Sequence, residues 1–162
     1  MKSVFIFKFV IIYLLANFGT LINQTSNEME ITKIIYHFGD SSVPPPYHRS
    51  YTVEIDKDSL SIVVDSYGSI LAERSYQLDS LQFDSIVANI DKYQIENQKQ
   101  VKNKGCTGGT SESISYFSGD EKLFSGYVYH CGGKDFGDMK GEVREFAREI
   151  KILIPELDSL LR

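Results

Sequence analysis

The densest group of side chains able to bind or react is Tyr47, His48 and Arg49, which follow three consecutive prolines in the stretch VPPPYHRSY (43–51). Tyrosine and arginine are enriched at the energetically dominant positions of protein interfaces, and histidine can change its charge near neutral pH. The prolines favour a stiff, extended backbone that lacks amide donors. The stretch therefore predicts either a binding patch held in a fixed position, or a rigid connection in which Tyr47 packs on the sheet edge and His48 and Arg49 are solvated.

A catalytic interpretation of the same stretch makes His48 the general base of a small hydrolase. The chain has three histidines and neither a G-x-S-x-G elbow nor an H-E-x-x-H helix, so a partner serine or carboxylate would meet His48 only in the folded chain. The segment DKD (56–58) lacks the later ligands and the glycine of a calcium loop. We therefore assign no catalytic residue, no metal site and no cofactor, and we favour a binding protein.

The two cysteines, Cys106 and Cys131, lie in the glycine-rich stretches GCTGGTS and HCGGK. These stretches flank the outer ends of a predicted hairpin, and an even pair of cysteines in an exported protein predicts a disulfide. Metal binding and a reactive thiol are the alternatives. Zinc would need two more ligands, and His130 precedes Cys131 in a strand, so the two side chains point to opposite faces.

The register of this hairpin depends on its turn. A two-residue turn at Ser118-Gly119 would place the cysteines directly opposite each other, whereas a four-residue turn over 118–121 would offset them by two residues. The glycine pairs at 108–109 and 132–133 could turn their amides toward an anion, but neither matches a P-loop or a dinucleotide fingerprint. We favour glycines that relieve crowding around a disulfide.

The first 24 residues predict export. Lys2 precedes a largely apolar run over 4–22 in which Lys8 is the single charged residue, as in a secretory signal. The run is also nearly long enough to cross a bilayer, so an uncleaved N-terminal membrane anchor is the alternative. Residues 25–30 are interpreted as a short tether and residues 31–162 as a single domain, which would be periplasmic or secreted.

The charge of the chain restricts its partners. The formal net charge is −5, and removal of residues 1–24 would take away two lysines and no acid, which gives −7. An acidic domain repels phosphate backbones and anionic lipid surfaces. We therefore expect a protein or small ligand of the cell envelope as partner, no nucleic acid, and membrane contact only through an uncleaved N-terminus.

Hydrophobic patterning predicts the elements that position these residues. Alternation predicts strands, and 3.6-residue periodicity after Asp79 and after Gly141 predicts two helices, the second divided or kinked at Pro155. The polar, lysine-rich stretch 94–105 is expected to be a loop. This pattern predicts an α+β fold with an antiparallel sheet of about six strands in the order ββββ-α-ββ-α and two helices packed on one face. The predicted strands cover 31–38, 50–55, 59–65, 69–78, 111–117 and 122–130.

The combination of SVPPPYHRSY, GCTGGTS and HCGGK after an export signal resembles a group of small exported bacterial proteins without an assigned function. The resemblance implies export and a disulfide, and it implies no activity. Three functions stay open on the residues: a non-enzymatic binding protein of the inhibitor or immunity type, a small envelope hydrolase using His48, and a structural envelope component anchored by the N-terminal segment.

Overall fold

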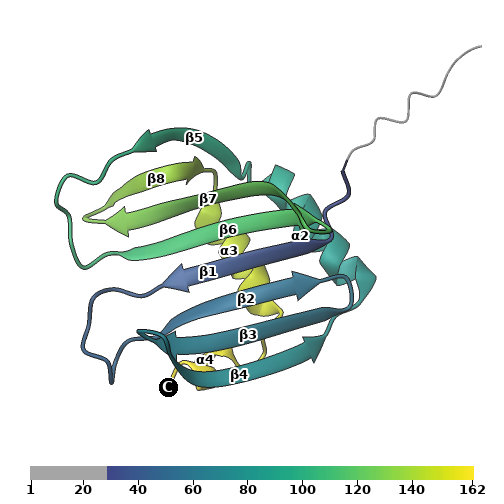
Figure 1. Ribbon diagram of the computed structural model, residues 1–162, viewed down its shortest axis with the longest axis horizontal. Helices are drawn as coiled ribbons and strands as arrows, with labels where there is room; N and C mark the ends of the chain where they lie inside the picture. Colours follow the sequence, from purple (N-terminus) through teal and green to yellow (C-terminus); the bar gives the residue numbers. More distant parts are fainter. Residues whose placement is uncertain (1–28) are drawn as a thin grey trace, which may run out of the picture.

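The computed structural model describes residues 29–162, so the predicted export signal and most of the tether lie outside the described residues (Figure 1). Eight strands in this part of the chain form one antiparallel sheet in the order β4-β3-β2-β1-β6-β7-β8-β5. The strands are β1 (Lys33–Gly39), β2 (Ser50–Asp56), β3 (Ser59–Ser66), β4 (Ser69–Gln77), β5 (Glu96–Val101), β6 (Thr110–Ser118), β7 (Glu121–Cys131) and β8 (Lys134–Lys140).

The helices α2 (Ser80–Lys92), α3 (Val143–Ile152) and α4 (Leu157–Leu160) lie on one face of the sheet (Figure 1). Helix α2 begins with the predicted capping box, because the Asp79 carboxylate accepts from the Gln82 amide at 2.8 Å and the Gln82 side chain accepts from the Asp79 amide at 3.1 Å. Pro155 lies between α3 and α4. Within residues 29–162, no helix is long and apolar enough to cross a membrane.

Alternating side chains of the sheet form the core beneath these helices. Strand β3 alternates buried and partly exposed positions along its whole length, as a half-buried strand requires. Its inward side chains meet those of β1 and β2 and the apolar faces of α2 and α3. The fully buried members include Ile34, Tyr36, Val53, Ile55, Leu60, Ile62, Val64, Ile114, Phe146 and Ile150.

The α+β class and the antiparallel sheet are confirmed, but the numbers of elements are corrected: residues 29–162 contain eight strands and three helices. Strand β5 falls in the predicted loop because ENQKQV is an edge strand whose side chains are mostly exposed, so it carries little apolar alternation. Strand β8, KDFGDMK, buries only Gly137 and Met139, and that signal is too short to predict a strand. The third helix arises because Pro155 separates α4 from α3.

The cysteines do not lie directly opposite each other, as the two-residue turn at Ser118-Gly119 would have placed them. Ser118 pairs with Glu121 across the turn, and the register then shifts at Tyr116, so that Thr110 lies opposite His130. Cys106 precedes β6 and lies in the connection from β5. The cysteines therefore meet because this loop folds back toward the end of β7, and not because they are cross-strand neighbours.

Candidate functional site

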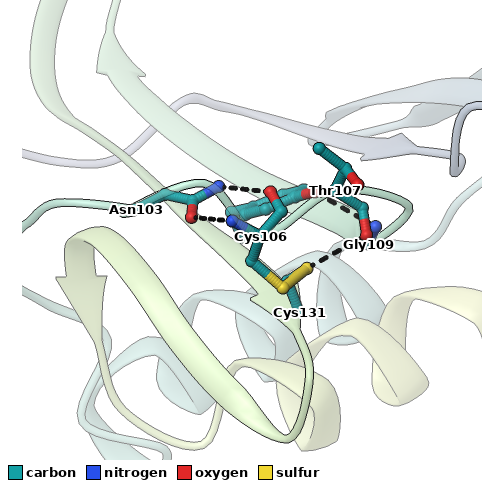
Figure 2. The surroundings of a disulfide bond; sticks show 6 residues. Asn103, Cys106, Thr107, Gly109 and Cys131 are labelled. Carbon is teal, nitrogen blue, oxygen red and sulfur yellow. Dashed lines mark hydrogen bonds between the residues drawn. A yellow bond between two sulfur atoms is a disulfide. The ribbon is translucent and has the colours of Figure 1, made fainter.

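The predicted disulfide joins Cys106 and Cys131, with their Cα atoms 6.0 Å apart (Figure 2). Asn103 holds the Cys106 backbone from both sides: its Oδ1 accepts from the Cys106 amide at 2.8 Å and its Nδ2 donates to the Cys106 carbonyl at 2.7 Å. A Cβ on Gly109 would lie 2.1 Å from the His130 carbonyl oxygen, so this position requires glycine. The bridge thus attaches a glycine-containing loop to the end of β7.

The three residues of the predicted patch have different surroundings. Tyr47 is 74% exposed, whereas His48 is 6% exposed. The Arg49 guanidinium donates to the His48 carbonyl at 2.7 Å and to the backbone oxygen of Arg162 at 3.0 Å, so it attaches the C-terminus to the connection between β1 and β2. Of the three side chains, Tyr47 is the one presented to solvent.

His48 lies beneath the aromatic ring of Tyr67. The two ring centroids are 3.9 Å apart with 23° between the planes. His48 Nε2 is 3.3 Å from Ser50 Oγ, and the buried Nδ1 has no hydrogen-bond partner. A general base needs a ring nitrogen that a substrate can reach. In this arrangement His48 supports Tyr67 instead of facing an open site.

Tyr67 adopts an unusual backbone conformation. It precedes Gly68 in the two-residue turn between β3 and β4, and both residues have positive φ, 51° and 85°. Such a turn matches the twist of a hairpin but favours asparagine or glycine, because a bulky side chain is strained there. The Tyr67 hydroxyl donates to the Val43 carbonyl at 2.6 Å. That bond and the His48 stack hold the strained residue in place.

Four exposed apolar side chains lie in the proline stretch and at or just after the β3–β4 turn, and we call them the aromatic corner: Tyr47, Tyr67, Ile70 and Leu71. All four side chains are between 48% and 74% exposed. The proline stretch meets the β3–β4 turn at this end of the sheet, where Ser66 Oγ donates to the Pro45 carbonyl at 2.9 Å. Sequence reasoning missed three of the four members. The sequence feature that could have predicted this surface is the adjacent apolar pair Ile70-Leu71, which breaks the alternation of an otherwise mostly polar strand.

A second cluster, the carboxylate–histidine network, crosses the other half of the sheet. Glu112 is 4% exposed, and its two oxygens contact different groups: Oε1 accepts from the Tyr36 hydroxyl at 2.8 Å, and Oε2 lies 2.9 Å from His130 Nε2. His130 Nδ1 lies 2.6 Å from Asp135 Oδ1. Burial, with additional contributions from Tyr51 and the Glu112 carboxylate, raises the pKa of Tyr36, so its hydroxyl remains a donor.

Two shallow depressions border this network. One, of about 400 Å³, is lined by residues that include Val128, Met139 and Arg144, and a smaller one by residues that include Phe38 and Lys151. Both reach His130, yet each ring nitrogen of His130 already contacts a carboxylate oxygen. The network can therefore stabilise the sheet, and a substrate could reach a ring nitrogen of His130 only by displacing one of these carboxylate contacts.

The network was also missed from sequence, where His130 was considered only as a partner of Cys131. The sequence feature that could have predicted the network is Glu112, an acidic residue on the same inward face of β6 as the buried Ile114. Across residues 29–162, no group of three or more His, Cys, Asp or Glu side chains is arranged to hold a metal ion.

No protein-family model matches the chain, and neither the curated proteins nor the solved structures contain a significant match. The class that the residues define is an α+β domain with helices on one sheet face and a disulfide at the end of β7. Functional inference for this protein therefore rests on its own surfaces.

Proposed function

We propose that this protein is an exported binding protein of the cell envelope, of the inhibitor or immunity type, which engages another protein through the aromatic corner. The observation that carries the proposal is Tyr67, an exposed tyrosine held at positive φ in a tight turn. A left-handed conformation costs a residue with a Cβ about 1–2 kcal/mol, and such strain concentrates at functional positions. An asparagine would suit the turn better and would remove the aromatic ring from the surface.

The surroundings of the corner favour tight protein binding. Tyrosine buries a large area on binding with few rotatable bonds, and it is enriched at interface positions where truncation costs 2 kcal/mol or more. Tyr67 is already ordered by its contacts with His48 and Val43, so little conformational entropy is left for a partner to remove. Tyr47 follows the proline stretch and lies beside this support.

The histidines support a binding role over a hydrolytic one. His48 is stacked beneath Tyr67, and His130 is engaged at both ring nitrogens. The hydrolase alternative therefore lacks an accessible base at the two histidines best placed for it. Export is part of the proposal because disulfides persist in oxidising compartments. Fractionation of the producing cells, with the mature N-terminus read by mass spectrometry, tests export and distinguishes a cleaved signal from an anchor.

Changing Tyr47 to alanine is expected to weaken partner binding about 30-fold or more, the equivalent of a hot spot worth 2 kcal/mol. The side chain is mostly exposed in the free protein, so the melting temperature should stay unchanged. The measurement is quantitative crosslinking capture from the native envelope, followed by titration with the captured partner.

The matched control is Tyr127→Ala, which removes an exposed tyrosine from β7, away from the corner. This variant should bind the partner as the unmodified protein does. Undiminished capture by Tyr47→Ala would remove the aromatic corner from consideration, and an equal loss in both variants would indicate a nonspecific contribution of exposed tyrosines.

A further inference from the structure

Three lysines border a depression beside the disulfide, which we call the lysine depression. It has a volume of about 430 Å³ and is lined by Lys102, Lys104 and Lys134 together with Cys106 and Cys131. Among the described residues, no aspartate or glutamate lines it, although acids outnumber lysines and arginines by 22 to 17 in the whole chain. This part of the surface is therefore locally positive on an acidic protein.

The positive charge of the lysine depression has no counter-charge within residues 29–162. None of its three lysines forms an ion pair there, whereas Lys140, on the same strand as Lys134, lies 2.8 Å from Glu96. Like charges gathered without a counter-charge repel one another, and an anionic group bound between them would remove that repulsion. The depression thus selects a ligand by the sign of its charge.

The disulfide joins the two segments that carry these lysines. One segment is the connection between β5 and β6, and the other is the turn at 132–133 with Lys134, the first residue of β8. Asn103 also fixes the Cys106 backbone through its two hydrogen bonds (Figure 2). The connection is attached to Cys131 before any ligand binds, and this preorganisation lowers the entropy cost of association.

The lysine depression lies at the same end of the sheet as the aromatic corner. The β5–β6 connection and the β7–β8 turn leave the sheet at the end where the proline stretch and the β3–β4 turn also lie (Figure 1). Four strand spacings separate β3 from β7, which is about 19 Å at about 4.8 Å for each spacing. An interface of ordinary size covers about 800 Å² on each partner, a patch about 30 Å across, so one partner can contact both surfaces.

We propose that the lysine depression binds an acidic segment of the partner protein, rich in aspartate or glutamate. This inference rests on the proposed function and specifies the charge of the partner. A short acidic segment can enter a local positive site, whereas an extended polyanion or an anionic membrane would also face the acidic remainder of the surface. Opposite charges across the interface would raise the association rate and fix the orientation of the partner.

The test titrates the purified full chain with a fluorescently labelled hexaglutamate peptide at low ionic strength, where exposed charges are least screened. Hexaglutamate should bind and a hexaglutamine peptide should not, and added salt should weaken the binding. The triple variant Lys102→Gln, Lys104→Gln and Lys134→Gln should bind hexaglutamate about tenfold more weakly, the effect of losing three exposed charge pairs. Its lysines are exposed, so its melting temperature should stay unchanged.

The matched control changes three lysines at the opposite end of the sheet to glutamine: Lys33, Lys57 and Lys122. It lowers the net charge by the same amount and should bind hexaglutamate nearly as the unmodified protein does. No binding of hexaglutamate, or equal weakening by the two triple variants, would overturn the proposal. Lysine-dependent binding of a heparin fragment or of phosphatidylglycerol vesicles, without binding of hexaglutamate, would overturn it and assign the depression to a sulfated polysaccharide or a membrane.

Tyr47→Ala separates this inference from the proposed function. This variant should bind hexaglutamate as the unmodified protein does, while its capture of the partner is lost. Capture that depends on Tyr47 without any binding of hexaglutamate overturns the lysine depression alone. Lysine-dependent binding of hexaglutamate with undiminished capture by Tyr47→Ala overturns the aromatic corner alone.

Discussion

Replacing His130 with alanine is expected to lower the free energy of unfolding by about 3 kcal/mol, at the upper end of the usual cost of leaving a buried polar group without its hydrogen-bond partner. His130 and Glu112 are both nearly inaccessible to water, with 11% and 5% of their side chains exposed. Without the imidazole, the Glu112 carboxylate keeps only the Tyr36 hydroxyl as a close partner. Chemical denaturation of the variant and the unmodified protein measures the difference.

His37→Ala provides a matched control. It removes a histidine from β1, which β6 separates from β7, and the Nδ1 of this histidine contacts a hydroxyl, Thr52 Oγ1, at 3.0 Å. A neutral hydrogen bond of this kind contributes about 0.5–1.5 kcal/mol, so the control should be much less destabilised. Adding Glu112→Gln to His130→Ala should restore part of the loss, because the buried charge is then gone. Equal stability of the two histidine variants would contradict the assigned role of the network.

Serine at both Cys106 and Cys131 is expected to lower the free energy of unfolding by about 3.5 kcal/mol. The bridge spans 25 residues, and the chain-entropy model gives a stabilisation of this size for such a loop. Native domains have only about 5–15 kcal/mol to lose, so the double variant should unfold at a clearly lower denaturant concentration. Guanidinium unfolding under non-reducing conditions is the measurement.

The unmodified protein in reductant serves as the control, because it should unfold near the midpoint of the double serine variant. Alkylation followed by intact mass tests the bond directly, and two freely alkylated thiols in protein taken from its native compartment would contradict it. His130 adjoins Cys131, so combining both changes should give a non-additive loss. Full additivity would show that the bridge and the network act independently.

The sequence predicted the features that depend on local order. Asp79 and Gln82 formed the expected capping box because both partners lie within one turn of chain. Pro155 separated α3 from α4 because it cannot donate a backbone hydrogen bond. The disulfide followed from the number of cysteines, although their register did not, since a shift at Tyr116 is not visible in the residue pattern.

Tertiary structure alone decided what the candidate site contains. Tyr47 and His48 are adjacent in sequence, yet one is mostly exposed and the other is buried beneath Tyr67, a residue of another turn. Glu112 and His130 meet because β6 and β7 pair in a register that sequence did not predict. Neighbours along the chain follow from short-range backbone rules, whereas neighbours across the sheet depend on register, and one residue of shift moves a side chain to the other face.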